Sequence, residues 1–305
     1  MRKFLIQCFK FGMLVATTLA AGEYLVRTYV DNPYKFKHEW MSRNAGDVEI
    51  LVLGSSHTYY GINPALFDSK AFNLANVSQI FHYDYVLLTQ YAGLYDSLKT
   101  VILPVSYFSF FDPEFEDSDT DWIYAVNYKI YMDVNEHSDF SKYNFELSRP
   151  AIYSGKLSSL LSGKGLSYDS LGMGTDYLSG SRQIGWEETG KQTAVRHTSA
   201  DHDAVEGHFR YARKIADFCR KRHLELVLVT TPAWHSYYEN LDPIQAEMTD
   251  SLIGVLRDQY GLHYLDYMRD KRFTADDFYD ADHLSSDVGA RKFTDILIRD
   301  LSTLK

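Results

Sequence analysis

A serine-rich turn follows a short aliphatic run in the first quarter of the chain. Residues 48–53 (VEILVL) end in Gly54-Ser55-Ser56-His57. A serine hydroxyl attacks a carbonyl when a neutral imidazole accepts its proton. Taken alone, such a turn is more commonly structural, with a serine capping the next helix. Ser56 is therefore a candidate nucleophile only if the chain also supplies a histidine and a carboxylate.

A second polar segment, FYDADHLSSDVGARKFTD, lies at residues 278–295 and places Asp280 and His283 three positions apart. A carboxylate bonded to an imidazole fixes its tautomer and stabilises the imidazolium. Asp280 and His283 are thus the candidate partners of Ser56. Asp282 is expected to be solvated or to be a charge at the start of the following helix.

His57 allows two interpretations. Beside the nucleophile it is placed to contact substrate, but a histidine between a strand and a helix is as often a polar residue satisfied by local hydrogen bonds. A metal site built on His57, Asp280, Asp282 and His283 is a third interpretation, which no H-x-H or H-E-x-x-H spacing supports. We expect neither a metal nor a cofactor.

The surrounding chain alternates between predicted strands and helices. Strands are predicted at residues 48–53, 71–74, 99–105, 225–231 and 262–265, and helices from Pro64 with Asn63 as N-cap and at 79–95, 202–222, 244–260 and 286–301. This alternation predicts an α/β fold, a doubly wound, flavodoxin-like three-layer sandwich around a five-stranded parallel sheet. Sites in such sheets form at the carboxyl ends of the strands, where Ser56 follows the first strand.

The segment between the third and fourth strands is longer than this fold requires. Its residues 112–200 form a large insertion that is acidic and aromatic. Because an insertion at the ligand-binding edge of an open sheet usually shapes specificity, we expect this one to border the site.

The N-terminus carries a targeting pattern. Arg2, Lys3 and Lys10 precede an apolar run at residues 11–21. We interpret residues 1–26 as a signal anchor, or as a cleaved signal peptide, residues 27–47 as a polar stalk and residues 48–305 as the folded domain. The anchor predicts a single-pass protein of the bacterial inner membrane with a periplasmic domain, and cleavage predicts a secreted one.

Composition narrows the class of partner. The net charge of -10 excludes a nucleic-acid binder, because such proteins need a basic surface to displace phosphate counterions. The two cysteines, Cys8 and Cys219, offer no disulfide framework within the chain. The 24 Tyr and 18 Phe suit a core and a cleft for sugars or acyl chains.

Three motifs together resemble the SGNH, or GDSL-type, hydrolase superfamily. They are Gly54-Ser55-Ser56 after the first strand, FNLANVSQ at residues 72–79 after the second, and Asp280-x-x-His283 before the last helix. The chain most resembles the membrane-anchored bacterial envelope branch, which includes alginate O-acetyltransferases and the protein that helps to D-alanylate teichoic acids. The resemblance implies that Ser56 is the nucleophile, with Ser55 in place of the family's aspartate, and that Asp280 and His283 are its partners.

The chain departs from the family pattern at the oxyanion donors. The family's second-block glycine, which donates a backbone N–H, corresponds to Ser78, whose own N–H can serve. The third-block asparagine has no counterpart in residues 103–111 (LPVSYFSFF). Asn76 or Asn73 is the candidate to compensate for it.

The resemblance implies a serine esterase or O-acyltransferase that acts on a cell-envelope or exported polysaccharide through an acyl-serine intermediate. Its partners would be an acylated polysaccharide or acyl donor, and the membrane through the N-terminal helix. The alternative is a non-catalytic binding or assembly subunit that partners a multi-spanning membrane acyltransferase. The missing asparagine favours this alternative, and the presence of Ser56, Asp280 and His283 disfavours it.

Overall fold

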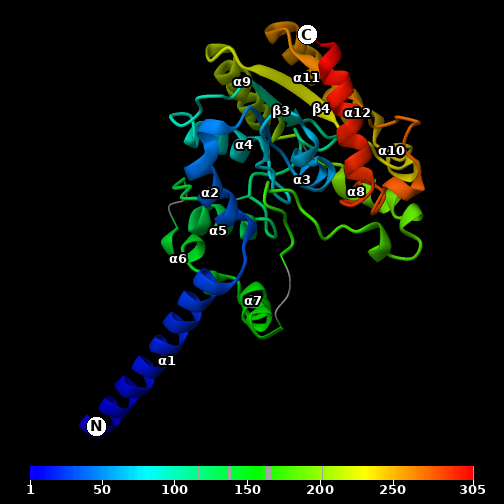
Figure 1. The fold of residues 1–305 in the computed structure, drawn as a ribbon. Helices are drawn as coiled ribbons and strands as arrows, with labels where there is room; N and C mark the ends of the chain where they lie inside the picture. Colours follow the sequence, from blue (N-terminus) through cyan, green and yellow to red (C-terminus); the bar gives the residue numbers. More distant parts are fainter. Residues whose placement is uncertain (116, 137–138, 163–165, 201, 305) are drawn as a thin grey trace.

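Five parallel strands form the centre of the molecule. This computed structural model (Figure 1) describes all residues except 116, 137–138, 163–165, 201 and 305. Its strands lie in the order β2-β1-β3-β4-β5. They are β1 (Ile50–Val52), β2 (Ala71–Asn73), β3 (Thr100–Pro104), β4 (Glu225–Thr230) and β5 (His263–Asp266). The predicted doubly wound parallel sheet is confirmed, with the strand order reversing between β1 and β3.

Aliphatic side chains cover both faces of the sheet, as expected for parallel strands between helices. Leu51 pairs in register with Val101, and both point to the face covered by α2 (Pro33–Asn44), α4 (Phe81–Gln90), α9 (Val205–Lys221) and α11 (Pro243–Tyr260). Val52 pairs with Ile102, and both point to the face covered by α12 (Gly289–Thr303). The alternation along each strand therefore divides the core into a first layer, which contains Leu51 and Val101, and a second layer, which contains Val52 and Ile102.

The helix after β1 begins earlier than the sequence predicts. It is α3 (Ser56–Gly61), which starts directly after Ser55. Asn63 and Pro64 instead form a short 3-10 turn, Pro64–Leu66, in which the Asn63 side chain accepts the N–H of Ala65 at 3.0 Å. Ser56 thus lies in the first turn of a helix and not in a loop before one.

Residues 27–47 differ from the predicted polar stalk. They contain α2, whose Tyr34 and Met41 are buried in the first core layer, while Trp40 stacks on Phe72 of β2 with ring centroids 3.9 Å apart. The apolar residues of this segment recur at helical spacing and so give it a face that packs against the domain.

The insertion contains α5 (Trp122–Tyr131), α6 (Phe140–Tyr143), α7 (Pro150–Ser162) and α8 (Gly190–His197). Its Phe115 and Tyr128 are buried in the first core layer. The chain then returns along the edge of the sheet, where Leu171 O accepts the N–H of Asn73 at 2.9 Å. Gly172 has φ +87°, and a Cβ there would lie 2.2 Å from the Asn73 carbonyl oxygen, so only glycine fits.

The N-terminal helix α1 (Arg2–Tyr29) projects from one end of the domain (Figure 1). Among the described residues it is the one helix long and apolar enough to cross a membrane. Most of its side chains are exposed, but Glu23 and Val26 are buried against the domain. The apolar N-terminal helix is therefore as predicted, although its last turns belong to the folded structure.

Candidate active site

A tight turn at the end of β1 presents Ser56. Gly54 has φ +107°, and a Cβ there would lie 1.9 Å from Cγ of Pro104, so the turn requires glycine. The Gly54 N–H donates to Oδ1 of Asp84 at 2.8 Å, which ties the turn to α4. Ser55 follows in an extended conformation as the N-cap of α3. The turn and the helix together fix the direction of the Ser56 side chain.

A chain of hydrogen bonds joins the three residues that the sequence singles out. Oγ of Ser56 lies 2.8 Å from Nε2 of His283, and Nδ1 of His283 lies 2.9 Å from Oδ1 of Asp280. The same carboxylate oxygen accepts the backbone N–H groups of Asp282 and His283 at 3.1 and 2.9 Å. These bonds hold Asp280 in place, so that it orients the imidazole toward Ser56.

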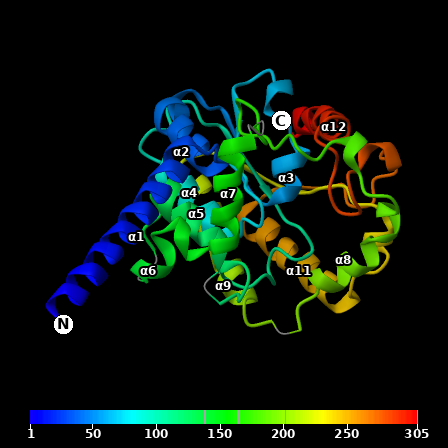
Figure 2. The ribbon, with the colours of Figure 1, turned by 90° about the horizontal axis from the view of Figure 1, so that it is seen from below.

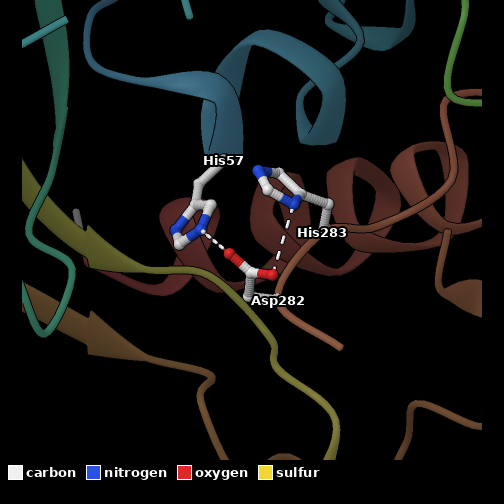
Figure 3. A group of neighbouring side chains, drawn as sticks. All are labelled: His57, Asp282 and His283. Atoms are coloured by element: carbon white, nitrogen blue, oxygen red, sulfur yellow. Dashed lines mark hydrogen bonds and ion pairs between the residues drawn. The ribbon is translucent and has the colours of Figure 1, made fainter. Parts of the chain in front are cut away.

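A second polar network joins His283 to Asp282 and His57 (Figure 3). The Asp282 carboxylate stands between two imidazoles, with Oδ2 at 3.3 Å from Nε2 of His57 and Oδ1 at 3.5 Å from Nδ1 of His283. Nδ1 of His57 lies 2.9 Å from Oγ of Ser106, which follows β3. The expectation of a solvated Asp282 is wrong, because its side chain is 3% exposed.

His57 is likewise buried and both its ring nitrogens have partners, which fits a satisfied polar residue. It also lines the cavity that opens beside Ser56, which fits contact with substrate, so both interpretations stay open. Sequence reasoning missed Ser106 altogether. The signal was its place in the chain, since it is the first hydroxyl after the third strand and lies at the same edge of the sheet as Ser56.

Burial and charge set the protonation of this network. Although burial alone lowers the pKa of His283, the nearby carboxylates of Asp282 and Asp280 outweigh it and raise that pKa to about 10. Burial alone raises the pKa of Asp282, but the two imidazoles keep it well below the usual range. Burial lowers the pKa of His57, and its bond to Asp282 offsets only part of this effect. The resting site thus favours an imidazolium at His283 and a neutral ring at His57.

The side chains of His57, Asp282 and His283 have the types and the spacing of a metal site. Ligand atoms of His57, Asp282 and His283 all lie within 4.8 Å of one another. However, both ring nitrogens of His283 already have partners, Asp280 and Ser56. Both ring nitrogens of His57 are likewise paired, with Ser106 and Asp282, so neither ring presents a free nitrogen to a cation. Their arrangement suits proton sharing better than it suits a metal that needs free nitrogen lone pairs.

A cavity of about 270 Å³ opens beside Ser56. Ser78 lies on its wall, with Phe108 and Phe115 as apolar sides and Asp112, Asp121 and Arg196 as charged groups. Ser78 has φ +58°, a left-handed conformation that favours glycine. Neither the N–H of Ser56 nor that of Ser78 is bonded to an acceptor in the described part of the chain. Both are thus free to bond an oxygen in the cavity.

The two asparagines considered as substitutes are placed differently. Asn73 is fully buried, and its amide donates to the carbonyls of Thr58 and Ile62 at 2.8 and 3.1 Å. Asn76 is 1% exposed and donates to Oε1 of Gln79 at 2.8 Å. Neither residue lines the cavity beside Ser56, so both support the backbone around Ser78 and the α3 turn.

The insertion forms much of the surroundings, as expected. Tyr177 stacks on Tyr60 and on Tyr279, with centroid separations of 3.7 and 4.1 Å, and its ring meets His283 edge to face at 5.3 Å. A second cavity of about 240 Å³ lies on the Asp280 side of the site. Its lining combines aromatic, amide and hydroxyl groups of the insertion: Gln183, Trp186, Thr189, Gln192 and Thr193.

A scan against protein-family models finds no match, and a search of curated proteins finds none. Solved structures that match include a "putative acylhydrolase" from Bacteroides fragilis NCTC 9343, which is 12% identical with a TM-score of 0.43 over 87% of this chain and 96% of that one. A "GDSL-like lipase" from Bacteroides thetaiotaomicron VPI-5482 is 9% identical with a TM-score of 0.41 over 88% and 98%.

Proposed function

We propose that the protein is a serine esterase or O-acyltransferase in which Ser56 is the nucleophile. The hydrogen-bonded chain from Ser56 through His283 to Asp280, beside an open cavity, carries this proposal. In the fraction of molecules whose His283 is neutral, Oγ of Ser56 attacks an acyl carbonyl while Nε2 of His283 takes its proton. The carboxylates of Asp280 and Asp282 stabilise the imidazolium that forms.

The proton on His283 then passes to the leaving alkoxide, and an acyl-serine remains. Water, deprotonated by the same imidazole, would release the acid, and a sugar hydroxyl in the same place would give a new ester. The N–H groups of Ser56 and Ser78 are the proposed oxyanion donors. Without the family's asparagine the site has one donor fewer, which costs on the order of 100 to 1000-fold in rate.

The proposed substrate is an acylated cell-envelope or exported polysaccharide. The cavity on the Asp280 side supports it, because a tryptophan, a tyrosine and several amides and hydroxyls suit stacking and hydrogen bonding to sugar rings. In this proposal α1 anchors the protein in the bacterial inner membrane with the domain in the periplasm. Its length and apolar surface support that role, and cleavage to a secreted form is the alternative.

A fluorophosphonate probe tests the nucleophile. Wild type should label at Ser56, as located by peptide mass mapping, and Ser56→Ala should not label. Ser55→Ala is the matched control, because Ser55 is the neighbouring hydroxyl in the same cavity and its side chain makes no capping bond. Equal labelling of wild type and Ser56→Ala, with both folded by circular dichroism, would exclude the assignment.

The two carboxylates beside Nδ1 of His283 favour the alternative, a non-catalytic binding or assembly subunit that partners a membrane acyltransferase. A pKa of about 10 leaves most His283 side chains protonated at neutral pH, and an imidazolium cannot accept the Ser56 proton. An enzyme of this kind should label faster as the pH rises toward 10. A folded protein that stays unlabelled at pH 10 would instead support the binding role.

A further inference from the structure

The last turns of α1 are built into the insertion. The Glu23 carboxylate accepts the backbone N–H of Glu146 at 2.7 Å and that of Leu147 at 3.1 Å. One turn later, the Arg27 guanidinium donates to the carbonyl oxygen of Asn144. A free tether would leave these groups in water, so the helix is docked here and not merely attached.

Two further contacts fix the direction of α1. A Cβ at Gly22 would lie 2.1 Å from Oη of Tyr153, so α1 and α7 meet closely at a glycine. Nζ of Lys35 donates to the carbonyls of Arg27 and Thr28 at 3.0 and 3.3 Å and so joins the end of α1 to α2. The domain therefore has one defined orientation relative to the helix axis.

The length of α1 places the membrane surface. The 22 residues before Glu23 span about 33 Å at about 1.5 Å per residue, enough to cross a hydrocarbon core of about 30 Å. Lys10 is the one charged side chain between Lys3 and Glu23, and its long stem can reach toward the N-terminal interface. If α1 crosses the bilayer, as proposed above, the lipid boundary lies at Gly22 and Glu23, at the level of α7.

Exposed aromatic rings lie at this level. Phe140 and Phe145 are 68% and 37% exposed and pack edge to face with centroids 5.4 Å apart, on either side of the Asn144 that binds Arg27. Tyr24, on α1 itself, is 62% exposed. Figure 2 shows α6 and α7 beside α1 where it leaves the domain. Aromatic side chains are enriched at the boundary between lipid and water.

We propose that the insertion binds the bilayer surface, with α7 in the headgroup region and the Phe140–Phe145 pair inserted at the boundary. This inference rests on the proposed membrane anchor but not on any catalytic role. The protein is then held at two places, by α1 through the bilayer and by the insertion on its surface. The docking of Glu23 sets the angle between them.

Depth-dependent quenching in vesicles tests this contact. The full chain, with Cys8→Ser and with Cys219 left in its buried place, carries an environment-sensitive fluorophore at Phe140→Cys and is reconstituted into phosphatidylcholine–phosphatidylglycerol vesicles. Val255→Cys is the matched control, since Val255 is 49% exposed and lies in α11, at the far end of the molecule from α7 (Figure 1). Nitroxide on the lipid headgroup should quench the label at 140 several-fold more than the label at 255, and equal quenching would overturn the proposal.

Two further samples separate the causes. A label on the native Cys8 should be quenched by nitroxide on the acyl chain; if it is not, α1 does not insert and the proposal falls together with the anchor. Quenching at Cys8 without quenching at 140 leaves the anchor intact and refutes only the surface contact. Glu23→Ala should lower quenching at 140 toward the value at 255 and leave Cys8 unchanged. Undiminished quenching at 140 would refute the role of Glu23.

Discussion

Replacing Asp282 by asparagine should move the pH dependence of the Ser56 reaction toward neutral pH. Asp282 is a buried carboxylate 3.5 Å from Nδ1 of His283, and it favours the imidazolium. Asparagine keeps the shape and an oxygen facing His57 but removes the charge. The pKa of His283 should therefore fall, because the charged form of the ring loses a counterion while Asp280 still orients it.

The distance sets the size of the effect. At 3.5 Å and an effective dielectric constant of about 20, Coulomb's law gives about 5 kcal/mol as an upper value. Opposite charges this close typically change a pKa by about 1 to 3 units, so we expect a decrease of about 2 units. If proton transfer is about half complete in the transition state, the weaker base lowers the plateau rate of Ser56 labelling about 10-fold. At pH 7 about 100-fold more His283 is neutral, so the labelling rate there rises about 10-fold.

The assay is the second-order rate of fluorophosphonate labelling at Ser56, measured from pH 6 to 10.5. Wild type should rise toward a midpoint near 10, and Asp282→Asn should rise toward one about 2 units lower. Asp280→Asn, the matched control, should instead lose about 1000 to 10000-fold at the plateau, because the tautomer of His283 is no longer fixed. A midpoint in Asp282→Asn that equals or exceeds that of wild type would refute the proposed role of this charge.

Three further predictions concern the turn that presents Ser56 and the proposed oxyanion donor Ser78. Gly54→Ala should cost more than about 3 kcal/mol in unfolding free energy and abolish labelling, since its Cβ would lie 1.9 Å from Pro104, and urea unfolding measures the loss. Burial raises the pKa of Asp84 to about 7, whereas its pKa in the unfolded chain is near 4. The folded protein therefore binds the proton more tightly than the unfolded chain does. The resulting stabilisation is complete below about pH 4 and is lost as the pH rises from about 4 to 7. Asp84→Asn should reduce that decline in unfolding free energy by up to about 4 kcal/mol, measured by urea unfolding at pH 4 to 7, and an unchanged decline would place the titrating group elsewhere. Ser78→Gly should add up to about 1 kcal/mol of unfolding free energy, because glycine adopts φ +58° without strain. The labelling rate should stay within about 3-fold of wild type, because the backbone N–H is retained. A large loss of labelling would mean that the Ser78 hydroxyl is needed.

The sheet and the Ser56–His283–Asp280 constellation could be predicted because their signals are local. A buried parallel strand needs a run of aliphatic residues, and such runs stand out at 48–53 and 225–231. The side chains at strand ends then meet at one edge whatever lies between them. For that reason residues more than 220 positions apart, Ser56 and His283, could be paired before any geometry was known.

Features that depend on tertiary contacts could not be predicted in this way. Nothing in the sequence around Asp282 separates a buried carboxylate from a solvated one, because its partner His57 lies in α3, far away along the chain. The prediction of a polar stalk failed for a related reason. The apolar residues of α2 pack against residues such as Phe72, which lie elsewhere in the sequence. The short α3 was missed because six residues give too little periodicity to recognise.

The close approach of Gly172 to the sheet limits how this protein can diversify. The insertion passes so near to β2 that one methyl group at position 172 would collide with the Asn73 carbonyl. A homologous insertion grafted in its place would therefore need a glycine at the same point, with the same left-handed backbone. An exchanged segment without that glycine would fit only if the edge of the sheet changed as well. New specificity should therefore arise more readily by substitutions within 175–196 than by exchange of the whole segment.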